Sequence, residues 1–219
     1  MSSEALLLEP TERTTLHRVP QRGTYERAQI DAILDAAAIC QIGYLIDSEP
    51  RVLPTVFWRT GKAVYWHGSR QSGALKAMAG REVCFTVTLL DGLVMARSAF
   101  HHSANYRSVM AFGRAEVLED TVSQMAAYRE MFDRLYPGRW SHIRGPSRAE
   151  LAATMVLKLE LTEVSAKART HGPVDAKGDL RQPAWAGVIP LSLRPGAPRP
   201  AEDLRPGGEP VAVPDWLGR

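Results

Sequence analysis

The sequence predicts a mainly β (α+β) fold, a small antiparallel β-barrel with two or three peripheral helices. Three observations carry this prediction. Short runs rich in β-branched and aromatic residues recur between residues 39 and 161, turn residues separate them, and two segments show helical periodicity instead. No GxGxxG motif follows a strand and no GxxxxGK[ST] motif occurs, so neither a Rossmann site nor a P-loop is indicated.

A helix and three strands are expected in the first third of the chain. Within residues 27–38, Ile30, Ile33, Leu34 and Ala37 recur at helical spacing and form one apolar face. The apolar period then changes to two, which is typical of strands, and the turn residues DSEP (47–50) and TG (60–61) divide the region into strands at 39–46, 52–59 and 62–67. This order predicts an antiparallel meander.

The middle of the chain adds a short helix and a hairpin. Residues 69–79 are expected to be helical, with Ser69 or Ser72 as the N-cap and Gly80 as the stop. The dipeptide Asp91-Gly92 lies between two apolar runs and is a strong signal for a tight hairpin turn. The sequence therefore predicts strands at 83–90 and 93–100 joined by that turn, and a further strand at 107–118.

A second long helix and a last strand complete the predicted barrel. The helix is expected at 119–136 and the last clear strand at 154–161. One side of that helix carries the apolar residues Val122, Met125, Phe132 and Leu135.

Three regions are expected along the chain: an N-terminal arm at 1–23, the barrel domain at 24–170 and an extension at 171–219. The extension is rich in Pro and Gly, yet it keeps Trp185 and other apolar residues, which a purely disordered tail rarely holds. We therefore expect it to dock on the barrel or on a partner subunit.

Composition excludes several functional classes. The net charge of +3 is spread along the 219 residues, so nucleic-acid binding is not expected. No run approaches the ~18 apolar residues that span a bilayer, and the apolar run at residues 5–8 is too short for a signal peptide, which predicts a cytoplasmic protein. Cys40 and Cys84 lie far apart in apolar runs and are expected to be buried, reduced thiols.

The stretch AFHHSANYRS (99–108) contains the first candidate site. Adjacent side chains of an extended chain point to opposite faces, so His101 and His102 cannot easily share a metal ion, and no metal site is expected. The four residues that could bind a ligand here are Asn105, Tyr106, Arg107 and Ser108. Their hydrogen-bond donors and single aromatic ring would suit a planar, anionic ligand. A cluster of polar residues at a surface turn explains them equally well.

The stretch YWHGSRQSGALKAM (65–78) contains the second candidate site. A predicted strand ends at His67-Gly68 and a helix follows, and helix starts favour phosphate groups, although many helices begin this way without binding one. Gly68 allows close approach of the backbone. The side chains that add donors here are Ser69, Arg70, Ser72 and Lys76. His67 is the best candidate for an acid or base, since a histidine pKa can lie near neutrality.

Three segments make the chain resemble a known family. YWHGS…LKAM (65–78), CFTVTLLDG continuing through NYRSVMAFGR (84–114), and ELAATMVLKLELTEVSAKAR (150–169) are similar to the pyridoxamine-5′-phosphate-oxidase-like superfamily, and within it to the flavin-nucleotide-binding group with nitroimidazole-reductase-type proteins. The resemblance spans about residues 18–195. It implies a six-stranded Greek-key split β-barrel, a homodimer, and FMN bound noncovalently at the subunit interface.

The resemblance also implies roles for particular residues. Pro54, Thr55, Val56 and Phe57 would follow the isoalloxazine edge, and His67, Gly68 and Ser69 would lie near the ribityl chain and phosphate. Arg107 and Ser108 match an Arg-Gln pair of the oxidases. The chain departs from the oxidases at Ser72-Gly73-Ala74, where they carry Ser-Arg-Lys. Arg70 or Lys76 would have to replace the two missing cations, and oxidation of pyridoxamine phosphate itself is not expected.

The expected function is therefore an FMN-dependent oxidoreductase that acts on a small planar substrate. Two alternatives stay open at this point. The chain could be a flavin or haem binding or storage protein without turnover, with a histidine as the haem ligand, or it could be a reductase that uses a deazaflavin in place of FMN.

Overall fold

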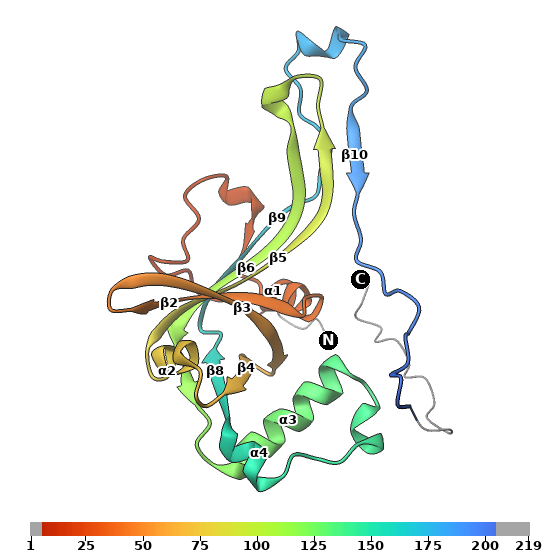
Figure 1. The fold of residues 1–219 in the computed structure, drawn as a ribbon. Coiled ribbons are helices and arrows are strands. Elements are labelled where there is room, and N and C mark those ends of the chain that lie inside the picture. The colour runs from red at the N-terminus through yellow and green to blue at the C-terminus, as the bar shows by residue number, and fades with distance from the viewer. Residues whose placement is uncertain (1–5, 205–219) are drawn as a thin grey trace, which may run out of the picture.

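The computed structural model describes residues 6–204, which form one antiparallel sheet with helices around it (Figure 1). Residues 1–5 of the expected arm and 205–219 of the expected extension lie outside the described residues. The elements are η1 (Pro20–Arg22), β1 (Gly23–Thr24), α1 (Arg27–Asp35), β2 (Ile39–Ile46), β3 (Glu49–Thr60), β4 (Ala63–Ser69), α2 (Gly73–Met78), β5 (Glu82–Met95), η2 (Ala99–His101), β6 (Ser103–Arg114), β7 (Glu116–Val117), α3 (Thr121–Leu135), η3 (Arg139–His142), α4 (Arg148–Ala153), β8 (Thr154–Glu160), β9 (Glu163–Arg169), η4 (Asp179–Arg181) and β10 (Gly187–Pro190).

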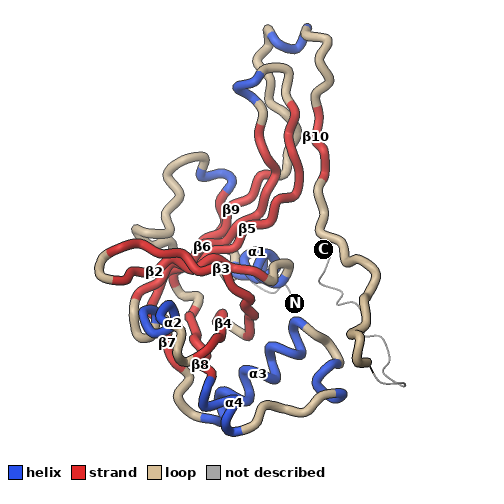
Figure 2. Tube along the Cα trace, viewed as in Figure 1, coloured by secondary structure: helices blue, strands red, loops and turns tan. Residues whose placement is uncertain are grey.

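The strand order confirms the predicted fold class. The sheet runs β1-β9-β6-β5-β2-β3-β4-β8-β7, and β10 pairs with the end of β5 at residues 92–95. Because β7 follows β6 directly in the chain yet pairs with β8 at the other end of the order, the sheet closes on itself as a barrel. Figure 2 shows the strands crossing around this barrel. The strands outnumber the six expected, since β9 and β10 follow the strand that the sequence suggested was the last.

Strand alternation divides the apolar side chains of β3 and β4 between two layers. Phe57 and Trp66 point into the barrel and belong to its main core, where Phe57 packs edge-on against Phe85 with ring centroids 5.1 Å apart. Trp58 and Tyr65 point outward, into a second apolar layer that helix α3 covers. The barrel therefore has an inner core and an outer layer beneath α3.

Helix α1 buries the apolar face that the sequence predicts. Ile30, Ile33, Leu34 and Ala37 are all buried in the main core, as their spacing indicates. Charged groups on the other side of the helix join it to the barrel, because Asp35 accepts two hydrogen bonds from the Arg59 guanidinium at 2.9 and 2.6 Å. The helical spacing of the apolar residues was sufficient to predict the buried face, because this helix has only one apolar face to bury.

The other two predicted helices are shorter than expected. Strand β4 continues to Ser69, so α2 begins at Gly73, with Ser72 as its N-cap and Gly80 in the left-handed region (φ 68°) just beyond its end. Helix α3 begins at Thr121 after the N-cap Asp120. Val122, which the sequence places on the apolar side of this helix, is 80% exposed in its first turn.

The predicted turn at Asp91-Gly92 is also wrong, because β5 runs through both residues and continues to Met95. The strand has an irregularity there instead, since its register with β6 shifts between Leu90 and Gly92. Arg107 on β6 holds the Asp91 carboxylate through two hydrogen bonds of 2.9 and 2.8 Å. A charge pair across the strands thus replaces the expected turn.

Gly92 is needed for close packing of the C-terminal extension. A Cβ atom at this position would lie 2.9 Å from the Ile189 carbonyl oxygen and 3.0 Å from a Val188 methyl carbon of β10. Strand β10 can therefore pair with β5 only because residue 92 has no side chain. The paired strands β5 and β6, with β10 beside them, form an arm that projects from the barrel (Figure 1).

Substitution of Gly92 by Ala should loosen the extension. We expect the overpacking to destabilise the pairing of β10 by about 1–3 kcal/mol, seen as faster hydrogen exchange and faster proteolysis of residues 170–190. Gly73→Ala serves as the control, because a Cβ there meets nothing within 4 Å. Equal protection of the extension in wild type and Gly92→Ala would contradict the proposed close fit.

Candidate functional site

The layer beneath α3 brings together aromatic side chains from separate elements. Trp58 of β3, Tyr65 and His67 of β4 and Tyr128 of α3 face one another there, with Val156 of β8 beneath them. Trp58 and Tyr65 stack nearly parallel with ring centroids 5.7 Å apart. The layer is apolar except at a few ring nitrogens and hydroxyl groups, so any polar atom in it needs a partner.

His67 lies in this layer with an unpaired ring nitrogen. Its ring is tilted against Trp58 and Tyr128, with centroid distances of 5.8 and 5.6 Å. The Nδ1 atom is shielded from solvent and has no hydrogen-bond partner among the described residues, and the same holds for the Nε1 atom of Trp58. Burial lowers the pKa of His67 below its ordinary value, so the imidazole is neutral at neutral pH.

Helix α3 is held over the layer by polar contacts at its middle and in its last turn. At its middle, the Tyr128 hydroxyl lies 3.3 Å from the Thr154 hydroxyl at the start of β8. Near its last turn, Arg134 lies 3.7 Å from the Asp35 carboxylate, which Arg59 also binds. These contacts fix the helix against the barrel and thereby fix Tyr128 against His67.

The predicted residues of β3 separate by strand alternation. Pro54 is exposed and Val56 packs against the outer layer, on the same face as Trp58. Phe57 is 1% exposed and lies inside the barrel, so its side chain cannot contact a ligand outside it, contrary to the expectation that it follows a flavin edge. Thr55 accepts the thiol hydrogen of Cys40 with its backbone oxygen, also on the inner side.

The predicted phosphate site at the start of α2 has fewer free donors than the sequence suggested. The helix has six residues, and the Ser72 hydroxyl is used as its cap, accepting a hydrogen bond from the Leu75 amide. Ser69 accepts one from the Gln71 amide, and the Lys76 ammonium donates one to the Gln71 side chain. Arg70 is the cation of this group whose side chain makes no hydrogen bond or ion pair among the described residues. Gly68 packs against Leu75.

The predicted cluster at 105–108 is divided between two faces of β6, and three of its side chains bind other residues of the chain. Asn105 is buried and accepts a hydrogen bond from Arg169, whereas Arg107 is paired with Asp91, which raises the pKa of the Arg107 guanidinium. Tyr106 and Ser108 lie on the opposite face, where the Ser108 hydroxyl donates to the Lys167 carbonyl at 3.2 Å. These residues hold the base of the arm together.

The structure does not place the two predicted groups on neighbouring strands. His67 and Gly68 lie on β4, and residues 105–108 lie on β6, with β5, β2 and β3 between them in the sheet order. Sequence reasoning missed Trp58, Tyr65 and Tyr128. Alternation around the Gly61-Lys62 turn could have identified the first two, because a two-residue turn places them on the same face as His67.

Two expected absences concern metals and membranes. Among residues 6–204, no group of three or more His, Cys, Asp and Glu side chains could hold a metal ion, and His102 uses its Nδ1 atom on the Ser98 carbonyl at 2.9 Å. No helix in the described part of the chain is long and apolar enough to cross a bilayer.

Comparisons with known proteins agree with this architecture. Residues 26–168 match the family model described as pyridoxamine 5′-phosphate oxidase. The flavocytochrome Anf3 from Azotobacter vinelandii is 39% identical and aligns with a TM-score of 0.87 over 95% of this chain and 96% of its own. The FAD and haem binding protein from Mycobacterium smegmatis is 34% identical, with a TM-score of 0.83 over 90% of this chain and 98% of its own.

A more distant structure shares the fold. A candidate 5-nitroimidazole antibiotic resistance protein from Bacteroides thetaiotaomicron is 20% identical, with a TM-score of 0.56 over 66% of this chain and 85% of its own. The comparison with curated protein sequences gave no significant match. The resemblance noted from the sequence is therefore confirmed.

The buried neutral His67 generates a prediction about pH. Because its pKa is lowered in the folded state, the unfolded chain takes up a proton first as the pH falls below about 6.5. The free energy of unfolding should therefore fall through that window, and His67→Phe should remove part of the fall. Thermal unfolding between pH 7 and pH 5 measures it, with His142→Gln as an exposed control. Identical pH profiles for wild type and His67→Phe would contradict the neutral, buried state.

Proposed function

The chain belongs to the pyridoxamine 5′-phosphate oxidase family, and on that premise we propose that it is a redox protein that binds both a flavin and a haem. Two proteins support this proposal, because each is more than 30% identical to this chain and aligns with nearly all of it. One is named a flavocytochrome and the other an FAD and haem binding protein, and both align over at least 90% of this chain.

His67 is the observation that carries the haem part of the proposal. A haem ligand must be a neutral imidazole in apolar surroundings, and His67 has a lowered pKa, aromatic neighbours and a buried Nδ1 atom without a hydrogen-bond partner among the described residues. An unpaired polar atom in a buried layer costs free energy unless a ligand compensates for it. The residues of the layer therefore fit a haem.

The cofactors would supply the electron transfer, since a haem exchanges single electrons and a flavin exchanges one electron or two. The chain itself supplies binding and shielding. His67 would bind the iron, Trp58 and Tyr128 would hold the imidazole ring in place, and α3 would exclude water from the layer. Without a haem, a general acid at His67 remains the second role, as the sequence suggested.

For the flavin we propose FAD, because the Mycobacterium relative is named for it and covers nearly all of this chain. FMN, which the sequence resemblance implies, is the alternative. The outer face of β3 is exposed at Pro54, where a flat ring could lie, and Arg70 is the uncommitted cation near the end of β4. The Ser72-Gly73-Ala74 segment lacks the cations of the oxidases, so pyridoxamine phosphate is not proposed as the substrate.

We also propose that two copies form the functional unit. The arm and the extension expose large apolar side chains that one chain does not cover, including Leu93 (43%), Phe100 (90%), Trp185 (65%) and Ile189 (43%). Apolar surface of this extent marks an interaction site. Because the family resemblance implies a flavin bound at the subunit interface, a second copy would also complete the flavin site.

The dimer proposal predicts a specific defect. Because they place charges on the apolar surface, Leu93→Asp and Ile189→Asp should shift the protein toward monomer by light scattering and should weaken flavin binding in parallel. Val122→Asp is the control, since Val122 is 80% exposed on α3, away from the arm. A wild-type monomer at micromolar concentration with its flavin bound would refute the proposal.

The cofactor proposal predicts two separable spectra. Purified protein reconstituted with haem should show both a flavin band and a Soret band, and His67→Ala should lose the Soret band while it keeps the flavin. Mass spectrometry of the flavin released by acid should identify FAD. His142→Ala is the matched control on η3.

Each alternative has its own outcome in that experiment. Release of FMN would overturn the choice of FAD, and absence of any flavin would overturn the flavin proposal. A haem spectrum unchanged in His67→Ala would exclude His67 as a ligand. If His67→Gln keeps both spectra but lowers reduction of a quinone by about 10²-fold, His67 acts as an acid instead.

A further inference from the structure

The aromatic layer leaves one nitrogen of His67 without an acceptor. The Nδ1 atom is shielded from solvent and has no hydrogen-bond partner among residues 6–204. Histidines that bind metals almost always donate their other ring N–H to a carboxylate, a backbone carbonyl or water, which makes the imidazole a stronger electron donor. Within the described residues, His67 departs from that pattern.

The groups that surround the imidazole hold it by their rings and methyl groups. Trp58 and Tyr128 present tilted rings, whose centroids lie 5.8 and 5.6 Å from that of His67. The Trp58 Nε1 atom is a donor and is itself buried without a partner, and the Tyr128 hydroxyl lies 3.3 Å from the Thr154 hydroxyl. On β8, the fully buried Val156 is the residue paired with His67 across the strands. Apolar and aromatic contacts therefore replace a hydrogen bond on Nδ1.

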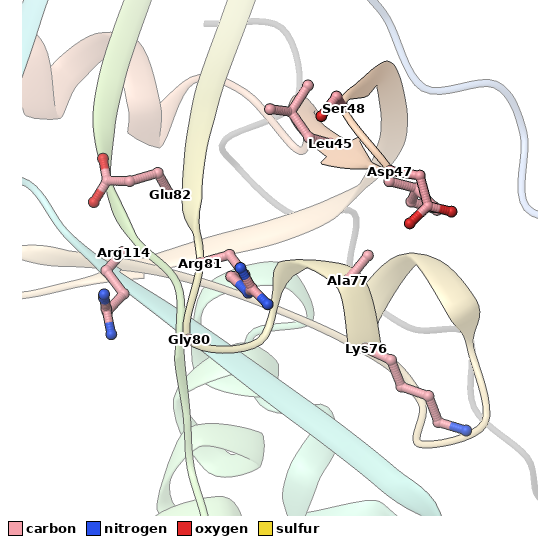
Figure 3. A pocket seen from close by; sticks show the side chains of 10 residues that line it. Leu45, Asp47, Ser48, Lys76, Ala77, Gly80, Arg81, Glu82 and Arg114 are labelled. Carbon is pink, nitrogen blue, oxygen red and sulfur yellow. The ribbon is translucent and has the colours of Figure 1, made fainter.

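No carboxylate of the described residues polarises the ring either. Burial is the cause of the lowered pKa of His67, and no charged group contributes to it in that part of the chain. Charged side chains gather instead at places such as the hollow of about 700 Å³ beside Gly80, which Asp47, Lys76 and Glu82 help to line (Figure 3). The imidazole is thus neutral and lies beyond the reach of a negative charge.

We propose that His67 binds the haem iron through Nε2 as a neutral imidazole that donates no hydrogen bond, and that this ligand favours the reduced, ferrous haem. The inference rests on the proposed haem function and goes beyond it. Nε2 is the nitrogen that remains for the iron, because Nδ1 is shielded. A hydrogen-bonded imidazole gives more electron density to the iron and stabilises the ferric state, so the absence of that bond raises the reduction potential. The apolar layer acts in the same direction, because burial disfavours the additional positive charge of ferric iron.

An acceptor placed beside His67 tests the proposal in the full-length, haem-loaded protein. Val156→Thr changes one methyl group to a hydroxyl on the residue paired with His67 and should give Nδ1 a partner. At a fixed potential, the ratio of ferric to ferrous haem should then rise about 2- to 10-fold, the range of one net hydrogen bond. Spectroelectrochemical titration measures this ratio, and the iron–histidine stretching frequency in resonance Raman spectra should rise with it. Val64→Thr is the matched control, because it makes the same change at a fully buried position on the inner face of β4.

A second test leaves the walls of the layer unchanged. His67→Gly reconstituted with haem should regain the spectrum of a histidine-ligated haem when imidazole or 1-methylimidazole is added. The methylated ring has no N–H to donate once its other nitrogen binds iron, and its methyl group can take the space of the missing Cβ atom. Because no acceptor awaits that N–H, 1-methylimidazole should bind at least as tightly as imidazole. An acceptor at Nδ1 would instead make imidazole the tighter ligand, by about 2- to 10-fold.

Thermal unfolding of each variant confirms that it is folded, and the outcomes separate this proposal from the proposed function. A Soret band that persists in His67→Ala would overturn His67 as a haem ligand. If His67→Ala loses the band, the haem ligand stands, and the absence of a hydrogen bond is tested by itself. It is refuted if imidazole binds His67→Gly more tightly than 1-methylimidazole does, or if Val156→Thr changes the potential no more than Val64→Thr.

Discussion

The alternation of side chains along β3 and β4 is the constraint on which the rest of the structure depends. Because successive residues point to opposite faces, Phe57 and Trp66 fill the barrel while Trp58, Tyr65 and His67 are placed outside it. A shift of one residue would exchange the two sets. The barrel core and the aromatic layer beneath α3 are thus two results of a single register, and the candidate haem ligand is fixed by the same pairing that fixes the fold.

Charged groups determine how the arm and the extension are attached to that barrel. Arg107 holds Asp91 within the arm, and Arg97 holds Asp175 of the extension through a bond of 2.7 Å. Arg169, which is 4% exposed, donates to the carbonyl groups of His171 and Gly172 where the extension begins. The arm is therefore held together by paired charges, while large apolar side chains on it stay exposed.

These features divide the molecule by chemistry. The aromatic layer is apolar, is covered by α3 and holds a neutral imidazole, which suits a redox cofactor. The hollow beside Gly80 is instead lined by exposed charged side chains of both signs (Figure 3).

The sequence by itself determined the fold class, the buried face of α1 and the family, because each depends on residues that are near one another in the chain or on a continuous motif. It offered Ser69 or Ser72 as the cap of α2, and the structure decides for Ser72. It also named His67 as a candidate site residue, which stays a prediction. Only the tertiary structure decided that Asp91-Gly92 is not a turn, because Arg107 and β10, which lie far away in sequence, occupy the space that a turn would need. Likewise, Tyr128 meets His67 only after α3 folds back over the barrel. Local patterns set which face a side chain takes, but contacts between distant segments decide what that face meets.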